Sequence, residues 1–304
     1  MKVSLELVSV LLTKVKAYHN AVQVARKHFI DWETLVFYAL LGRGGTFRAR
    51  KGGAVSYDAK KLLRKLVRME KAWRLLGYVL PQLRFETDAI IIPDYFGRDF
   101  RIPWRTDSVS PPSFLLNIHY PFDVNGDVVL DIGAYLGDTP LMWLYKGAKS
   151  VIAVEPVPLH FQFLERNVAG LPVICINASL AVQLPLHPSL EGSMKYGIYI
   201  LHDTKNASRL RVPIVQLTEL VNTYHPTFVK LDCEGCEHYV LKQLIQLPQL
   251  GVKKLAVEFH KTGVFQHSKG LDFLRKNLGN NFKVWDMGDG VTMIYWSSPY
   301  VGEK

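Results

Sequence analysis

A short apolar run that leads into a glycine-containing turn has the residue types needed to bind a charged ligand. The run Val128–Leu130 is followed by Asp131, and the turn beyond it holds Gly133, Gly137 and Asp138. Glycine lets a backbone approach a ligand closely, but this spacing is not the G-x-G-x-x-G of dinucleotide sites. The two carboxylates would repel a pyrophosphate and attract a ligand that carries an ammonium and a sulfonium group. These residues therefore predict a site for S-adenosylmethionine.

Polar side chains also follow the next two apolar runs. Glu155 comes directly after Val151–Val154 and lies 22 positions beyond Gly133 (155 − 133), where a βαβ topology places the carboxylate that binds ribose hydroxyls. Asn177 and Ala178 follow the third run. Each of these residues, taken alone, is equally typical of a plain strand end. The residues that we assign to cofactor binding are Asp131, Gly133, Ala134, Gly137, Asp138, Thr139, Glu155, Pro156, Asn177 and Ala178.

Three sequence elements together resemble the FkbM family of S-adenosylmethionine-dependent methyltransferases. They are Asp131-Ile132-Gly133-Ala134, Glu155-Pro156 and Lys230-Leu231-Asp232-Cys233-Glu234-Gly235-Cys236-Glu237, of which the last is the most specific. The resemblance covers roughly residues 113–296. It implies a seven-stranded class I methyltransferase fold and, usually, O-methylation of a hydroxyl on a sugar, a polyketide or a similar acceptor. In that fold the position of Asn177 and Ala178 lines the adenine pocket. Tyr135 departs from the asparagine common at its position in the family, so we assign it no cofactor contact.

The fourth and fifth strands of this fold are neighbours, and their ends carry candidate catalytic groups. Asp232 ends one strand, and Glu258 and His260 end the other on the same face. An alcohol acceptor must lose a proton during methyl transfer, so a base is expected within hydrogen-bond reach. The candidates for this base, in order of preference, are Asp232, His260 and Glu234. We expect Lys230 to be an electrostatic or acceptor-orienting group. The alternative is structural, with Asp232 as a helix N-cap, Glu234 complementing the helix dipole and Glu237 on the surface.

Metal-ligating residues also occur near these strand ends. Some O-methyltransferases of this fold hold Mg²⁺ with carboxylates, and Asp232 and Glu258 would suit that use. No third oxygen ligand is evident, so we assign no metal ligands. Cys233-x-x-Cys236 with His238 nearby is compatible with a zinc or redox site. Because a second cysteine pair is missing, we interpret both cysteines as ordinary variable positions of the motif.

The order of apolar runs predicts an α/β, Rossmann-like fold with a mixed, seven-stranded sheet of the class I methyltransferase type. Runs and helical patterns alternate, which builds a parallel sheet between helices, and a final hairpin makes the sheet mixed. Thr139 is the expected N-cap of the helix after the glycine turn, with Pro140 at its first position. The expected strands are Val128–Leu130, Val151–Val154, Val173–Ile176, Phe228–Leu231, Leu255–Val257, Phe282–Asp286 and Val291–Trp296, and the expected helices lie near 139–147, 158–168, 234–247 and 269–278.

The first third of the sequence differs from the rest in charge. Residues 1–110 contain 20 basic and 10 acidic side chains, whereas residues 111–304 contain 17 of each. Helical spacing predicts helices over 3–15 and 62–76, and the turn at 94–97 predicts a β-hairpin. We therefore expect a basic N-terminal region over 1–110, mostly helical with a hairpin and concerned with substrate recognition, and a methyltransferase domain over 111–304.

The segment 43–74 is especially basic, with Arg43, Arg48, Arg50, Lys51 and seven helix cations against only Asp58 and Glu70. Such a helix could contact a nucleic acid, an anionic membrane surface or an anionic acceptor. The commoner outcome is a solvated outer face on a packed helix. The segment 108–112, rich in serine and proline, is the expected linker to the second region.

Composition narrows the classes of protein. Of the 304 residues, 48% are hydrophobic and 21% are charged, which is ordinary globular usage. No apolar run approaches the roughly 20 residues needed to span a bilayer, and the N-terminus does not resemble a signal peptide. We expect a cytoplasmic S-adenosylmethionine-dependent O-methyltransferase acting on a small-molecule or glycan-like hydroxyl. The alternatives are an RNA methyltransferase that uses the basic region, and a catalytically silent cofactor-binding scaffold.

Overall fold

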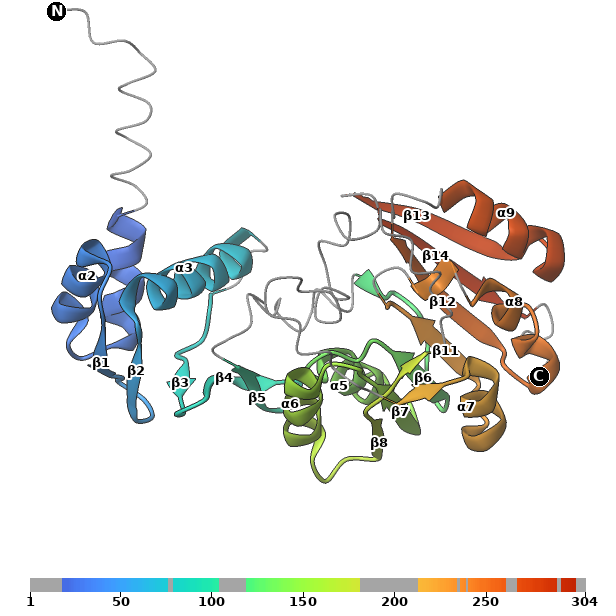
Figure 1. Ribbon diagram of the computed structural model, residues 1–304, viewed down its shortest axis with the longest axis horizontal. Helices are drawn as coiled ribbons and strands as arrows, with labels where there is room; N and C mark the ends of the chain where they lie inside the picture. Colours follow the sequence, from blue (N-terminus) through green and yellow to red (C-terminus); the bar gives the residue numbers. More distant parts are fainter. Residues whose placement is uncertain are drawn as a thin grey trace, which may run out of the picture. The chain divides into compact units, whose positions relative to one another are not determined.

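The computed structural model divides the chain into two compact units, Met1–Pro121 and Phe122–Lys304 (Figure 1). The sequence analysis placed the division after residue 110. Both the helix expected over 3–15 and the linker expected over 108–112 lie outside the described residues. The structure describes residues 18–75, 79–103, 119–180, 213–233, 236–238, 240–260, 267–288 and 291–298.

The N-terminal unit combines helices with antiparallel strands, as expected. Its basic helix buries one face, which includes Leu62, Leu66 and Met69. The antiparallel β1–β2 hairpin was not foreseen, because its glycines and arginines obscure the alternation that marks a strand. In chain order the elements are helical residues 18–28, α2 (Trp32–Leu41), β1 (Gly44–Arg48), β2 (Ala54–Asp58), α3 (Ala59–Leu75), β3 (Arg84–Phe85), β4 (Ala89–Tyr95) and β5 (Arg98–Pro103).

The C-terminal unit is built on a mixed seven-stranded sheet, which confirms the expected fold. The strand order is β13-β14-β12-β11-β6-β7-β8, and β14 runs antiparallel to both of its neighbours (Figure 1). The order reverses beside β6, so ligands are expected off the carboxyl ends of β6 and the strands next to it. The strands are β6 (Val128–Ile132), β7 (Ser150–Val154), β8 (Val173–Ile176), β11 (Phe228–Leu231), β12 (Lys254–His260), β13 (Phe282–Gly288) and β14 (Val291–Ser297). Two short strands, β9 (Ser179–Leu180) and β10 (Ile214–Val215), pair separately.

The helices of this unit follow the expected order with two corrections. The helix after the glycine turn begins at Asp138 with Gly137 as its N-cap, so Thr139 is not the cap. The single helix expected over 234–247 is wrong, because the described part of that segment forms two short, separate helices, η3 (Cys236–His238) and α8 (Leu241–Leu244). Glu237 and His238 point inward there and contact His260, which is incompatible with a surface helix. The helices are α5 (Asp138–Tyr145), α6 (Pro158–Val168), α7 (Leu217–Tyr224), η3 (Cys236–His238), α8 (Leu241–Leu244), η4 (Leu247–Leu250) and α9 (His267–Leu278).

The two faces of the sheet have different contents. Alternate residues of the central strands join α7, α8 and α9 in the main hydrophobic core of the unit. The intervening residues point to the other face, and three of them are charged and buried: Asp131, Lys230 and Glu258. The parallel register of β6 and β11 places Asp131 directly opposite Lys230. The sheet therefore brings together polar groups that are far apart in the sequence.

Among the described residues, no helix is both long enough and apolar enough to cross a bilayer.

Gly133 is the closest point between the end of β6 and the end of β11. Its φ is +79°, and a Cβ at this position would collide with the backbone carbonyl oxygen of Asp232. The backbone of Asp232 is fixed there, since its N–H donates to the carbonyl of Ile132 at 3.1 Å. From the sequence, we expected Gly133 to make room for a ligand. In the structure, its lack of a side chain makes room for the neighbouring strand end.

We predict that Gly133→Ala destabilises the protein by about 3–5 kcal/mol, because a backbone atom cannot move aside as a side chain can. Gly170→Ala is a matched control, since Gly170 has a φ of +77° and a Cβ added there would meet no atom within 4 Å. The control should lose only about 1–2 kcal/mol from the left-handed backbone. Urea unfolding of both variants measures the difference, and equal losses would show that the contact with Asp232 is unimportant.

Candidate cofactor and active site

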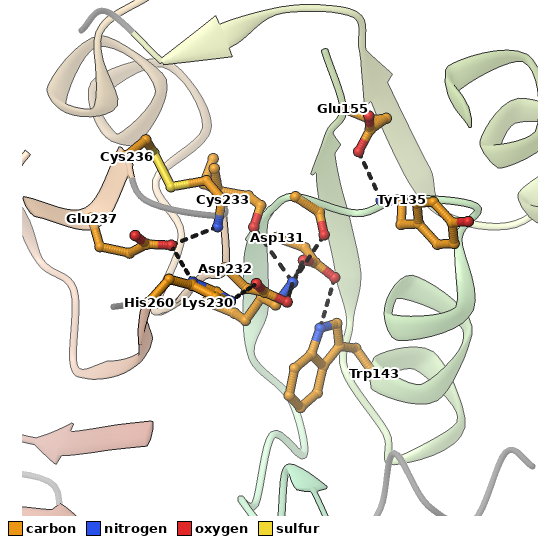
Figure 2. Close-up of polar contacts among 12 residues, drawn as sticks. Asp131, Tyr135, Trp143, Glu155, Lys230, Asp232, Cys233, Cys236, Glu237 and His260 are labelled. Carbon is orange, nitrogen blue, oxygen red and sulfur yellow. Dashed lines mark hydrogen bonds and ion pairs between the residues drawn. A yellow bond between two sulfur atoms is a disulfide. The ribbon is translucent and has the colours of Figure 1, made fainter. Parts of the chain in front are cut away.

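The glycine turn is anchored to the end of β7 by one carboxylate. Glu155 is 4% exposed, and its Oε2 accepts the backbone N–H of Tyr135 at 3.0 Å (Figure 2). Its Oε1 accepts the N–H of Val157 at 2.9 Å and lies 3.4 Å from Nδ1 of His160. An ionised carboxylate has about four acceptor positions, so the ribose-binding role assigned to Glu155 is compatible with these bonds.

Tyr135 adopts a left-handed backbone conformation, with a φ of 48°. Asparagine tolerates this region better than most residues do. This conformation is a physical reason for the asparagine that the family commonly has at this position.

The residues assigned to the adenine side lie in two different environments. Asn177 donates its side-chain amide to the carbonyls of Glu155 and Pro156, at 2.8 and 3.2 Å. It therefore connects the ends of β7 and β8. Ala178 is 1% exposed and belongs to the main hydrophobic core. The structure thus gives Asn177 and Pro156 a place at the sheet edge, whereas Ala178 is a packing residue.

Asp131 is completely buried at the end of β6. Its Oδ2 accepts the indole N–H of Trp143 at 3.0 Å, and its Oδ1 lies 3.1 Å from Nζ of Lys230 (Figure 2). The negative charge that we expected to attract a sulfonium group is therefore already paired with an ammonium group of the protein.

Lys230 holds the glycine turn and the acidic motif together. Its ammonium group donates to the carbonyl of Gly133 at 3.0 Å and lies 3.4 Å from Oδ2 of Asp232. Burial by itself would lower the pKa of Lys230, but the nearby carboxylates Asp131, Asp232 and Glu258 outweigh it and raise this pKa above its usual value. Lys230 therefore remains protonated and cannot act as a base. This agrees with the electrostatic role expected from the sequence.

Asp138 and Thr139 occupy the first turn of α5 and are also buried, at 9% and 6% exposure. Burial raises the pKa of Asp138 from its ordinary value of 3.8 to about 6, although the charge of Lys230 partly opposes this shift. The hydroxyl of Thr139 has no hydrogen-bond partner among the described residues. A buried carboxylate and a buried hydroxyl without a partner are both suited to contacts with a polar ligand.

The end of β12 carries the second half of the candidate site. His260 is its last residue, and Nδ1 of His260 lies 3.1 Å from Oε1 of Glu237 (Figure 2). The same oxygen accepts the backbone N–H of Cys233 at 2.9 Å. On the other side of the ring, Nε2 lies 3.7 Å from Oδ1 of Asp232. His260 is thus held between two carboxylates, of which Glu237 is completely buried and Asp232 is partly exposed.

Three of the four residues expected to be catalytic lie together. Asp232, His260 and Lys230 meet at the adjoining ends of β11 and β12, while Glu234 lies outside the described residues. Glu237 was missed, because the sequence allowed it to be a surface residue. The available signal was its fixed place in the acidic motif, five positions after Asp232 (237 − 232). Glu258 supports the charge of Lys230.

The cysteines of the motif form a disulfide bond. Cys233 and Cys236 are joined, with their Cα atoms 5.4 Å apart, so neither offers a thiolate to zinc in this form. A different group could hold a metal ion. Asp232, Glu237 and His260 each offer one ligand atom, and these atoms lie within 4.8 Å of one another. This set differs from the pair of Asp232 and Glu258 considered from the sequence.

We predict that Asp138→Asn changes how stability depends on pH. The folded state raises the pKa of Asp138 to about 6, so the folded protein holds this proton more tightly than the unfolded chain does. The stability contributed by this group is present below pH ~4 and is lost as the pH rises to ~6, amounting to roughly 3 kcal/mol at most. Asp138→Asn should remove this loss and increase the free energy of unfolding at pH 8.

Asp272→Asn is the control, because Asp272 is exposed on α9. Urea unfolding between pH 4 and 8 should give parallel curves for wild type and control. A curve for Asp138→Asn that is parallel to these would contradict the prediction. A bound cation stabilises a carboxylate. If the ammonium group of S-adenosylmethionine binds beside Asp138, a saturating concentration should therefore reduce the loss of stability that wild type shows as the pH rises.

Comparison with known proteins agrees with this geometry. The model of the family described as Methyltransferase FkbM domain matches residues 131–283. A comparison with curated proteins finds no match.

Several solved structures are similar at low identity. A conserved hypothetical protein of Streptococcus pyogenes has 11% identity, with 60% of this chain and 92% of that chain covered and a TM-score of 0.37. A ribosomal protein L11 methylase from Lactobacillus delbrueckii subsp. bulgaricus has 15% identity, 62% and 77% coverage and a TM-score of 0.34. Fibrillarin of Aeropyrum pernix, solved with natively bound S-adenosyl-L-methionine, has 12% identity, 68% and 88% coverage and a TM-score of 0.37.

These structural similarities are too distant to indicate what the chain acts on. The family model is more informative, because it covers half of the chain and contains the glycine turn, Glu155 and the acidic motif. The chain belongs to the FkbM methyltransferase family and is an S-adenosylmethionine-dependent methyltransferase.

Proposed function

We propose that the protein is an O-methyltransferase that methylates a hydroxyl of a small-molecule or glycan-like acceptor, with His260 as the general base. In this reaction the acceptor oxygen attacks the methyl carbon, and the carbon–sulfur bond breaks as the sulfur takes its electron pair. S-adenosylhomocysteine leaves as a neutral thioether. The acceptor proton must go to a protein group, and placing that group correctly is a large part of the catalysis.

The observation that carries the proposal is the contact between His260 and the buried Glu237. An ionised carboxylate only accepts hydrogen bonds, and Oε1 of Glu237 already accepts the N–H of Cys233. Nδ1 of His260 therefore carries a proton that it donates to Glu237, at 3.1 Å. In the neutral ring this leaves the lone pair on Nε2, the nitrogen that faces Asp232 and the partly exposed end of the site.

Asp232 is a weaker base than its position suggests. The ammonium group of Lys230 lies 3.4 Å from its Oδ2, and a cation at this distance favours the ionised carboxylate. We therefore place His260 ahead of Asp232 as the base. Asp232 would stabilise the imidazolium that forms when His260 accepts the proton. Our proposed cofactor residues remain Asp131, Gly133, Ala134, Gly137, Asp138, Thr139, Glu155, Pro156 and Asn177.

A second candidate acceptor is RNA, because one face of α3 carries exposed cations. Glu70 contacts Lys27, which lies outside α3, at 3.3 Å, and Asp58 accepts the backbone N–H of Lys61 at the start of the helix. Lys65 points inward and donates to the carbonyl of Pro103. The apolar face of α3 is buried and is not exposed for insertion into lipid, which favours phosphates over a membrane. The exposed cations are Lys60, Lys61, Arg64, Arg68, Lys71 and Arg74.

We predict that His260→Ala lowers the rate of methyl transfer by about 100-fold or more while the Kd for S-adenosylmethionine changes little. Asp232→Asn should have a smaller effect on the rate, and His19→Ala, at an exposed position in the other unit, should have none. The measurement is tritium transfer from labelled S-adenosylmethionine to a small-molecule and glycan extract and, separately, to total cell RNA. Calorimetry gives the Kd of each variant.

Three results would count against this assignment. Equal losses of rate and of cofactor affinity in His260→Ala would remove His260 from the role of base. If tritium is transferred only to RNA, the acceptor is RNA and not a hydroxyl-bearing small molecule. Activity that a chelator abolishes and Mn²⁺ or Mg²⁺ restores would mean that Asp232, Glu237 and His260 bind a cation.

A further inference from the structure

The disulfide bond connects the two segments that hold His260. Asp232 directly precedes Cys233, and Glu237 directly follows Cys236. The bond between the two sulfur atoms therefore links the two carboxylates on either side of the imidazole by a short covalent path (Figure 2). The position of Glu237 relative to Asp232 is fixed by this bond, in addition to the backbone between them.

Glu237 is held in a place that a carboxylate would not otherwise favour. It is completely buried, and its Oε2 has no hydrogen-bond partner among the described residues. A buried carboxylate that lacks part of its hydrogen bonding is less stable than one in water. The neighbouring disulfide is a covalent constraint that helps to keep Glu237 against His260. The N–H that helps to hold it belongs to Cys233, one end of the disulfide.

We propose that Cys233 and Cys236 form a redox-modification site, and that breaking their disulfide releases Glu237 and inactivates the methyltransferase. The proposal rests on the function proposed above, since it concerns the position of His260. A dithiol is the chemical class of reductant. Its thiolate attacks one sulfur, the sulfur–sulfur bond breaks, and the second thiol of the reductant then closes its own disulfide. Two electrons and two protons pass to the protein, which gains two cysteine thiols.

The exposure of the two disulfide-bonded cysteines, and the low reactivity of the third cysteine, agree with this proposal. Cys233 is only partly buried, whereas Cys236 is 8% exposed, so attack is expected at the sulfur of Cys233 with Cys236 as the leaving thiolate. The third cysteine, Cys175, lies on β8 and is not in a disulfide. Burial raises the pKa of Cys175 to about 11, which leaves it as an unreactive thiol at neutral pH. It provides a matched control within the same chain.

The test compares oxidised and dithiothreitol-reduced protein, with the thiols counted by alkylation and mass spectrometry. Nitrogen-15 NMR at pH 8 reports which ring nitrogen of His260 carries the proton, and this readout needs no acceptor. We expect a dominant Nδ1–H form in the oxidised protein and a shift toward Nε2–H after reduction. Methyl transfer should fall by about tenfold or more, because a small displacement of a catalytic group has an effect of this size. The Kd for S-adenosylmethionine should stay within about twofold, since the hydrogen bonds that hold the glycine turn come from Glu155 and Lys230 and not from the cysteines.

Two variants complete the comparison. The double variant Cys233→Ser/Cys236→Ser should behave like the reduced protein and ignore the reductant, and Cys175→Ser should respond as wild type does. An unchanged proton position and an equal rate in both redox states would overturn the proposal while leaving O-methylation intact. A rate that falls without a shift at His260 would also overturn it. A shift at His260 in a protein that labels no hydroxyl compound in either state would support the redox site and reject the proposed function.

Discussion

The rest of the site depends on the ion pairs and the hydrogen bond that the buried ammonium group of Lys230 makes. Its side chain is 1% exposed, and an ammonium group so buried is tolerated only with opposite charges and hydrogen-bond acceptors around it. Asp131 supplies one charge from β6, Asp232 supplies another beyond β11, and the carbonyl of Gly133 accepts a hydrogen bond. Because these partners belong to both halves of the site, the cofactor turn and the acidic motif are positioned by the same cation.

Two acidic groups of this site are buried in positions that lower the stability of the folded protein. Asp138 has a raised pKa because it is buried, and Glu237 has one oxygen without a partner among the described residues. Such features lower the free energy of unfolding and persist where a site needs them. The negative charge that we expected to bind the sulfonium group is also shared with Lys230. Asp131 is one of three buried carboxylates in this part of the site, together with Asp138 and Glu155.

The end of β12 gives the site its chemistry. A histidine between a buried and a partly exposed carboxylate has one ring nitrogen fixed by a hydrogen bond and the other directed at the site. This arrangement suits proton removal from an acceptor, and the same three side chains could hold a divalent cation. The disulfide beside them adds a covalent constraint within the acidic motif.

The sequence by itself determined where the strands lie along the chain, the position of the glycine turn and the residues at the strand ends. These follow from local properties, namely apolar runs of strand length, turn residues and a short motif, which do not depend on the rest of the chain. The sequence also led us to expect Asp232 and His260 at neighbouring strand ends, but only the tertiary structure decided the individual contacts of the site. The register between β6 and β11 pairs Lys230 with Asp131, the crowding at Asp232 explains Gly133, and the inward turn after β11 buries Glu237 against His260. Burial, charge pairing and steric contact arise between residues distant in sequence, so no local pattern could reveal them.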